Sequence, residues 1–150
     1  MSEPMIFSST TARFALPLLF AAQAQKELFV NEGLARADAL LHPVCEGIAS
    51  TPSDNPRDGE CWLVGTPASG AFAGREDALA CRQQGQWLFA VPQDGMRVFD
   101  RALGKDRRYQ GGWRAAEDVA VPAGGQIVDT EARAAIEAML KALQVAGILG

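Results

Sequence analysis

Apolar residues recur at helical spacing near the beginning of the chain. Between residues 23 and 48 they advance by alternating steps of four and three, at Val30, Leu34, Ala37, Leu41, Val44 and Ile48. This spacing predicts an amphipathic helix. Pro43 should end or kink that helix near Leu41, because its ring clashes with the preceding turn and restricts His42, although the apolar stripe continues beyond it.

The middle of the chain changes to the pattern of short strands. Residues 49–59 are rich in Ser, Pro, Asp, Asn and Gly, which is typical of a connector. Short apolar or alternating runs follow at residues 60–64, 78–82, 87–91, 96–100 and 107–110, with a stub at Trp113. Because glycine-bearing turns separate most of these runs, they predict an antiparallel meander.

Two stretches of this middle region resemble each other. WLVGTPASG at residues 62–70 and WLFAVPQDG at residues 87–95 both begin with Trp-Leu, carry Pro five places later and end in Gly. Trp-Leu would begin a strand, Pro would close it, and Gly would provide the following turn. The likeness suggests duplicated hairpins whose tryptophans pack into a shared core.

The end of the chain has a second helical pattern. Residues 119–126 have the composition of a linker, and Asp129 or Thr130 can cap the helix that follows. An apolar stripe with heptad steps runs through Ala132, Ile136, Met139, Leu143 and Ala146. Gly147 is placed for a left-handed cap, which would bring Ile148 against Leu143.

These elements predict an α+β fold with an N-terminal amphipathic helix, a small antiparallel β meander and a C-terminal helix. The expected organisation is an N-terminal arm at residues 1–22, a helix plus antiparallel β domain at 23–118, and a linker with the C-terminal helix at 119–150. A chain of 150 residues is large enough to bury a real core.

Composition narrows the range of partners. The net charge is −4 and the basic residues are scattered, so nucleic-acid binding is not expected. No stretch approaches the roughly 18 apolar residues of a membrane-spanning helix, and residues 14–22 make a poor signal peptide. The odd count of three cysteines, Cys45, Cys61 and Cys81, predicts isolated core thiols rather than bridges.

Catalytic chemistry is poorly represented. His42 is the only histidine, and it lies beside a helix-ending proline without a nucleophile-elbow motif around any serine. Acidic pairs such as Asp54 and Asp58 occur in polar loops, where carboxylates are usually solvated. We therefore expect neither an enzyme, nor a metal site, nor a cofactor.

Aromatic residues are the first candidates for a binding function. Tryptophans at strand starts are most often core residues, but an exposed aromatic pair can stack on a sugar ring. Tyr109 and Trp113 flank a glycine turn, so they are the pair expected at the surface and the candidate glycan-binding residues.

The helices provide a second kind of candidate surface. The first helix carries amides and charges of both signs that could bond across subunits, and the apolar stripe of the second could pack between copies. The alternatives are that the polar face of the first helix is solvated and that the apolar stripes of both helices pack within one chain. The candidate interface residues are Gln23, Gln25, Lys26, Glu27, Asn31, Glu32, Arg36 and Leu143.

The chain resembles a family of phage-associated proteins known only as a domain of unknown function. The resemblance is carried by a Leu-Pro-Leu-Leu stretch (16–19), Gln-Ala-Gln-Lys-Glu (23–27), Asn-Glu (31–32), then Leu34, Arg36, residues 38–40 and Pro43. It continues through Gly-x-x-Trp-x-Val-Gly (59–65), Gly-x-Trp leading to Pro (85–92) and Gly-Gly-Trp (111–113), and so spans residues 16–113.

This resemblance implies a structural protein of an alphaproteobacterial phage or gene transfer agent, of the kind found in tail fibres and head spikes. With only a helix after residue 112, an adaptor, base or short spike is expected rather than a long fibre. The implied partners are further copies of the chain, with a trimer favoured, and other virion proteins. The implied location is a virion or phage-like particle assembled in the bacterial cytoplasm, with a role in host attachment.

Two other functional classes remain open from the sequence. A glycan-binding module would recognise bacterial surface polysaccharide through the sheet aromatics. A small hydrolase acting on surface glycan is the weakest alternative, because acid-base groups are few.

Overall fold

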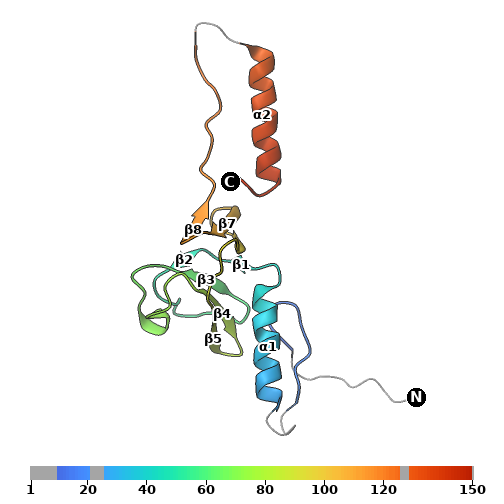
Figure 1. The fold of residues 1–150 in the computed structure, drawn as a ribbon, viewed down its shortest axis with the longest axis vertical. Coiled ribbons are helices and arrows are strands. Elements are labelled where there is room, and N and C mark those ends of the chain that lie inside the picture. Colours follow the sequence, from blue (N-terminus) through green and yellow to red (C-terminus); the bar gives the residue numbers. More distant parts are fainter. Residues whose placement is uncertain (1–9, 21–25, 126–128, 150) are drawn as a thin grey trace, which may run out of the picture. The chain divides into compact units, whose positions relative to one another are not determined.

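The chain forms an α+β fold, as the sequence predicts. The computed structural model describes residues 10–20, 26–125 and 129–149 (Figure 1). Within them lie α1 (Lys26–Leu40), β1 (Val44–Cys45), β2 (Ile48–Ala49), β3 (Cys61–Val64), η1 (Gly70–Phe72), β4 (Leu79–Gln83), β5 (Gln86–Ala90), β6 (Arg97–Asp100), β7 (Lys105–Tyr109), β8 (Trp113–Ala115) and α2 (Thr130–Val145). Two compact units divide between Pro92 and Gln93.

The first unit contains a sheet in the order β2-β3-β4-β5. Strands β3, β4 and β5 are antiparallel neighbours in sequence order, which confirms the predicted meander for this part. The prediction of a purely antiparallel arrangement is wrong at β2, which pairs in parallel with β3. Two-residue strands such as β2 have no sequence period, so their pairing depends on the tertiary fold.

The core of the first unit centres on the fully buried side chain of Phe72. Trp62 and Trp87 both pack against this cluster, and the Phe72 and Trp87 rings meet edge to face at 5.0 Å. The shared tryptophan core is therefore confirmed. The duplicated hairpins are not, because β3 and β5 are both neighbours of β4 in one meander, and β5 is the last strand of its sheet.

Helix α1 ends at Leu40, close to the predicted stop before Pro43. His42 has a positive φ of 44°, which no helix can contain. The predicted amphipathic stripe is wrong as a core-facing surface, because Val30 and Leu41 are exposed and Asp38 and Ala39 are the residues that α1 buries. Beyond the proline, Val44 and Ile48 belong to strands instead.

The second unit begins with the antiparallel meander β6-β7-β8. Asp100 is 1% exposed and accepts hydrogen bonds from Arg107 Nε at 2.6 Å and from the backbone of the turn that follows β6. Lys105 is also buried, and its Nζ donates to Ala116 O and Asp118 Oδ1, both at 2.8 Å. These buried charges fix the meander and the start of the extended chain after it.

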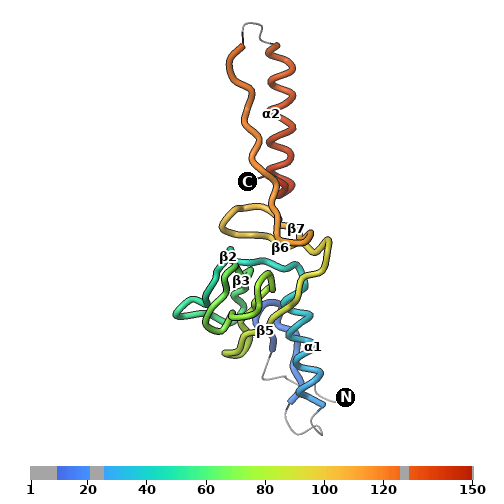
Figure 2. The backbone as a smooth tube through the Cα atoms, turned by 60° about the vertical axis from the view of Figure 1, so that its left-hand side comes forward, coloured from blue at the N-terminus to red at the C-terminus, as the bar shows by residue number. Residues whose placement is uncertain are grey.

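Helix α2 follows this extended segment and runs beside it (Figure 2). Asp129 caps the helix by accepting a hydrogen bond from Ala132 N at 2.9 Å. Gly147 has φ 70°, and Ile148 N donates to Leu143 O at 3.0 Å, which is the predicted left-handed cap. The Asp106 amide donates to Gly147 O at 2.9 Å and holds the helix end on β7.

Two of the three cysteines are disulfide-bonded, so the prediction of isolated thiols is wrong for them. Cys61 and Cys81 are directly opposite in the register of β3 and β4, and their Cα atoms are 4.1 Å apart. Cys45 is buried and does not take part in this bridge. An odd count cannot reveal a pair that strand register brings together.

The bridge gives a measurable thiol count. Denatured protein that has not been reduced should have one titratable thiol, and reduction should raise the count to three. In the Cys45→Ala variant, the corresponding counts should be none and two. Replacing Cys61 and Cys81 together by alanine should lower the free energy of unfolding in urea by about 3 kcal/mol, since the bridge closes a loop of roughly 20 residues. Three free thiols in the oxidised protein would contradict the bridge.

Candidate functional site

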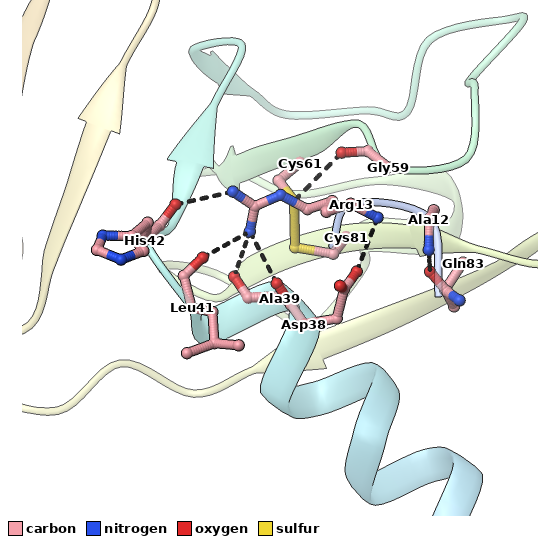
Figure 3. The surroundings of a disulfide bond; sticks show 10 residues. All are labelled: Ala12, Arg13, Asp38, Ala39, Leu41, His42, Gly59, Cys61, Cys81 and Gln83. Atoms are coloured by element: carbon pink, nitrogen blue, oxygen red, sulfur yellow. Dashed lines mark hydrogen bonds between the residues drawn. A yellow bond between two sulfur atoms is a disulfide. The ribbon is translucent and has the colours of Figure 1, made fainter. Parts of the chain in front are cut away.

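The carboxylate of Asp38 connects the N-terminal segment to α1. It is 2% exposed and accepts hydrogen bonds from Thr11 Oγ1 and Phe14 N, both at 2.7 Å. A third bond comes from Arg13 N at 3.0 Å (Figure 3). Thr11 also accepts a bond from Leu16 N at 2.9 Å, which closes the turn between them. A buried carboxylate thus orders a segment that has no regular structure.

Arg13 completes the junction by capping the C-terminal end of α1. Its Nη1 donates to the carbonyls of Asp38, Ala39 and Leu41, and its Nη2 donates to His42 O at 2.8 Å. The last carbonyls of a helix lack intrahelical partners and carry partial negative charge, so a guanidinium satisfies both needs. The end of α1 is therefore held by a charge from outside the helix.

The same segment reaches the sheet. Ala12 N donates to Gln83 Oε1 at 3.1 Å on β4. A side chain on Gly59 would contact Ala12 and Arg13 at 3.5–3.6 Å, which shows how closely the segment packs beside the disulfide strand. Residues 11–13 therefore join α1 to the sheet.

The predicted interface residues of α1 have different roles in the structure. Asn31 forms two hydrogen bonds with the backbone of Leu19, at 2.8 and 3.0 Å, so its amide positions the N-terminal segment. Glu32 and Arg36 form an exposed i, i+4 ion pair at 2.7 Å. Lys26 is exposed and Glu27 is half-buried. Gln23 and Gln25 lie outside the described residues.

A groove of about 430 Å³ lies between α1 and β5. Its helix wall includes Glu32, Ala35 and Arg36, and its strand wall is β5 with the side chain of Arg75 nearby. Arg36 Nη1 crosses toward the strand and donates to Phe89 O at 3.4 Å. The sequence does not reveal this groove, because the contact that crosses it joins residues 53 positions apart, Arg36 and Phe89.

Both helices expose apolar side chains. On α1 the largest are Leu28 and Phe29, which are 68% and 80% exposed. On α2 no residue is buried, and Met139 and Leu143 of the predicted stripe are 59% and 38% exposed. These surfaces are the described parts of the chain that best suit a protein partner.

Tyr109 and Trp113, the predicted glycan-binding pair, are brought together. They are directly opposite in the register of β7 and β8, and their rings meet at 5.3 Å and 66°. Both side chains are half-buried. The edge-to-face contact orders the pair and leaves part of each ring accessible.

The contacts of His42 indicate a structural role. Its backbone carbonyl accepts from Arg13, and its ring lies 6.4 Å from that of Phe14. Among the described residues, no group of three His, Cys, Asp or Glu side chains could hold a metal ion. Neither helix in the described ranges has the length and apolar character needed to cross a membrane.

The chain belongs to the family described as Protein of unknown function (DUF2793), whose profile matches residues 30–114. This match covers more than half of the chain and extends from α1 to β8. It includes Asp38 and the groove walls on α1 and β5, whereas Arg13 and α2 lie outside it. No curated protein and no solved structure matches this chain.

Loss of the Asp38 carboxylate should weaken the junction. In Asp38→Asn the side-chain NH2 group takes the place of a carboxylate oxygen that accepts a hydrogen bond. This buried NH2 group would then face another donor, so we expect the free energy of unfolding to fall by about 2 kcal/mol. Urea denaturation measures this loss, with the exposed Asp54→Asn as the charge-matched control. Equal stability of Asp38→Asn and wild type would show that the carboxylate does not hold the segment.

Proposed function

We propose that this chain is a non-enzymatic structural component of a phage or gene-transfer-agent particle, serving as a tail-fibre or head-spike adaptor or base in host-surface attachment. The resemblance of residues 16–113 to phage-associated proteins supports this setting. The observation that carries the proposal is the uncovered apolar stripe of α2, because it calls for a protein partner.

Helix α2 obtains little stability from its own chain. It has 16 residues, none of them buried, which is barely above the length of about 12–15 residues below which an isolated helix is marginal in water. Its side-chain hydrogen bonds to the preceding extended segment come from a different face of the helix, where Arg133 donates to Pro122 O and Gly124 O. Ala132, Met139, Leu143 and Ala146 of the stripe therefore remain exposed, whereas Ile136 is half-buried.

Heptad spacing favours further copies of the same chain as the partner. Stripes that advance by three and four pack by placing side chains of one helix between those of its neighbours. Alanines at the two ends allow the helices to approach closely. We propose a homo-oligomer, with a closed trimer favoured, which joins other virion proteins in a particle assembled in the bacterial cytoplasm.

Charges on the stripe should prevent this assembly. Met139→Glu with Leu143→Glu should give a monomer by light-scattering mass measurement and abolish incorporation into purified particles, because buried unpaired carboxylates are strongly unfavourable. Ala134→Glu with Val145→Glu adds the same charge elsewhere on the helix and should leave both unchanged. A monomeric wild-type chain, or its absence from particles, would refute the proposal.

The second candidate function is glycan binding through Tyr109 and Trp113. The ordered, half-buried aromatic pair favours it, since two rings held at 5.3 Å present an apolar surface beside the polar groups of the meander. Bacterial surface polysaccharide would be the ligand. Such binding is compatible with an attachment role.

Removal of the rings separates this candidate from the structural one. Tyr109→Ala and Trp113→Ala should each lower glycan affinity, and with it the array signal, by about five- to 150-fold, which is the effect of losing about 1–3 kcal/mol of ring stacking. Circular dichroism checks that the variants remain folded, and Phe99→Ala removes an exposed ring from the same meander as the control. Wild-type protein without array signal would exclude the glycan-binding module.

A further inference from the structure

Strand β5 forms an open edge of its sheet. It is the last strand in the order β2-β3-β4-β5, and no other strand of the described residues pairs with its outer side. An edge strand presents a row of backbone donors and acceptors, which is a template for an added strand.

The backbone groups on this edge can be identified from the register. Arg82 N donates to Glu60 O, and Arg82 O accepts from Gly59 N, so the backbone of Arg82 faces β3. Cys81 and Gln83, one residue away on either side, therefore bond with Leu88 and Gln86 across the β4–β5 pair. It follows that the N–H and C=O groups of Trp87 and Phe89 point away from β4.

The groove provides the space beside these groups. Helix α1 lies along the outer side of β5 (Figures 1 and 2), and the small side chain of Ala35 lines the space between them. Arg36 Nη1 already donates to Phe89 O at 3.4 Å, which identifies this carbonyl as an accessible acceptor. A five-residue strand spans about 17 Å, so the edge matches a short extended segment.

The aromatic rings beside the groove are already occupied. The Phe89 ring meets Phe72 edge to face at 6.0 Å and has Arg75 over it at 5.2 Å. The Trp87 ring likewise contacts Phe72 and has Arg82 over it at 5.3 Å. Neither ring is therefore open for stacking on a sugar, and the backbone edge is the stronger recognition element.

Charge sets the kind of segment that fits. Arg36 and Arg75 line the groove, Arg82 lies beside it over Trp87, and Glu32 is the acidic residue in the lining. Glu32 is paired with Arg36, so Arg75 and Arg82 leave the surroundings with a net positive charge, within a chain of net charge −4. Basic walls favour carboxylate side chains on an entering strand and disfavour a basic one.

We propose that the groove between α1 and β5 binds an extended acidic peptide segment of a partner protein, which adds as a strand to the edge of β5. Main-chain bonds to Trp87 and Phe89 provide affinity, and the arginines select acidic side chains. This proposal is independent of the α2 oligomer and of glycan binding.

An array of acidic decapeptides provides the probe. The strongest binder is then measured in solution against the full wild-type chain. Binding should protect the Trp87 and Phe89 amides from hydrogen exchange. Two peptides should be compared, one methylated on the backbone nitrogens of its odd-numbered residues and one on those of its even-numbered residues. Only one of them should lose binding, because every second residue of an added strand bonds to the edge of the sheet. These two measurements require no altered protein.

Variants of the chain test the groove itself. Ala35→Trp should fill it, and Arg75→Glu should reverse its charge, so each should weaken peptide binding at least about tenfold, a change of 1.4 kcal/mol. Arg114→Glu makes the same charge change in the other unit and should leave the affinity unaltered. Melting curves from circular dichroism show which variants remain folded.

Three results would overturn the proposal: no binding by any acidic peptide, binding without protection of the Trp87 and Phe89 amides, or equal binding by the Arg75→Glu variant. An acidic polysaccharide that binds wild type but not Ala35→Trp, with peptides inactive, would instead assign the groove to glycans. None of these results bears on the mass of the oligomer, so the two proposals can fail separately.

Discussion

The first unit depends on one buried carboxylate and the guanidinium beside it. Asp38 orders residues 11–14 through three hydrogen bonds, and Arg13 then caps the open end of α1. Since α1 buries only Asp38 and Ala39 among its residues, apolar packing does little to position it. Helix α1 forms one wall of the groove beside β5, and this polar junction, together with Asn31 and Arg36, holds α1 in that position.

The second unit uses buried charges in a similar way. Asp100 and Lys105 are nearly inaccessible, and each is satisfied by a charged partner and by backbone groups of the neighbouring segment. Such pairs contribute less to net stability than to a unique geometry, because desolvation offsets much of their attraction. Here that geometry fixes where the chain leaves the meander before α2.

In both units, polar contacts anchor a helix at one end while apolar surface stays exposed along its body. Leu28 and Phe29 on α1, and Met139 and Leu143 on α2, are the clearest examples. Exposed apolar residues on an anchored helix are available to a protein partner. The arrangement therefore connects the local energetics of each helix to the assembly that we propose.

Features that depend on near neighbours along the chain can be predicted from the amino-acid sequence. The positions of β3 to β8, the Asp129 cap, the Gly147 end of α2 and the stop of α1 before Pro43 all follow from local period, turn residues and backbone restriction, whereas β1 and β2 were not predicted. Tyr109 and Trp113 were expected near the surface beside a glycine turn, and the structure adds that they are directly opposite each other on β7 and β8.

Only the tertiary structure decided what comes together over long separations. The bridge between Cys61 and Cys81, the parallel pairing of β2 with β3, and the groove between α1 and β5 depend on register and docking. Asp38 gave no signal in the sequence, since a carboxylate in a charged helix looks solvated until its donors, which lie 24–27 residues earlier, are in place. The spacing of residues along the chain predicts the helices and strands. Their arrangement is stabilised by contacts between groups far apart in the sequence, which residue spacing does not predict.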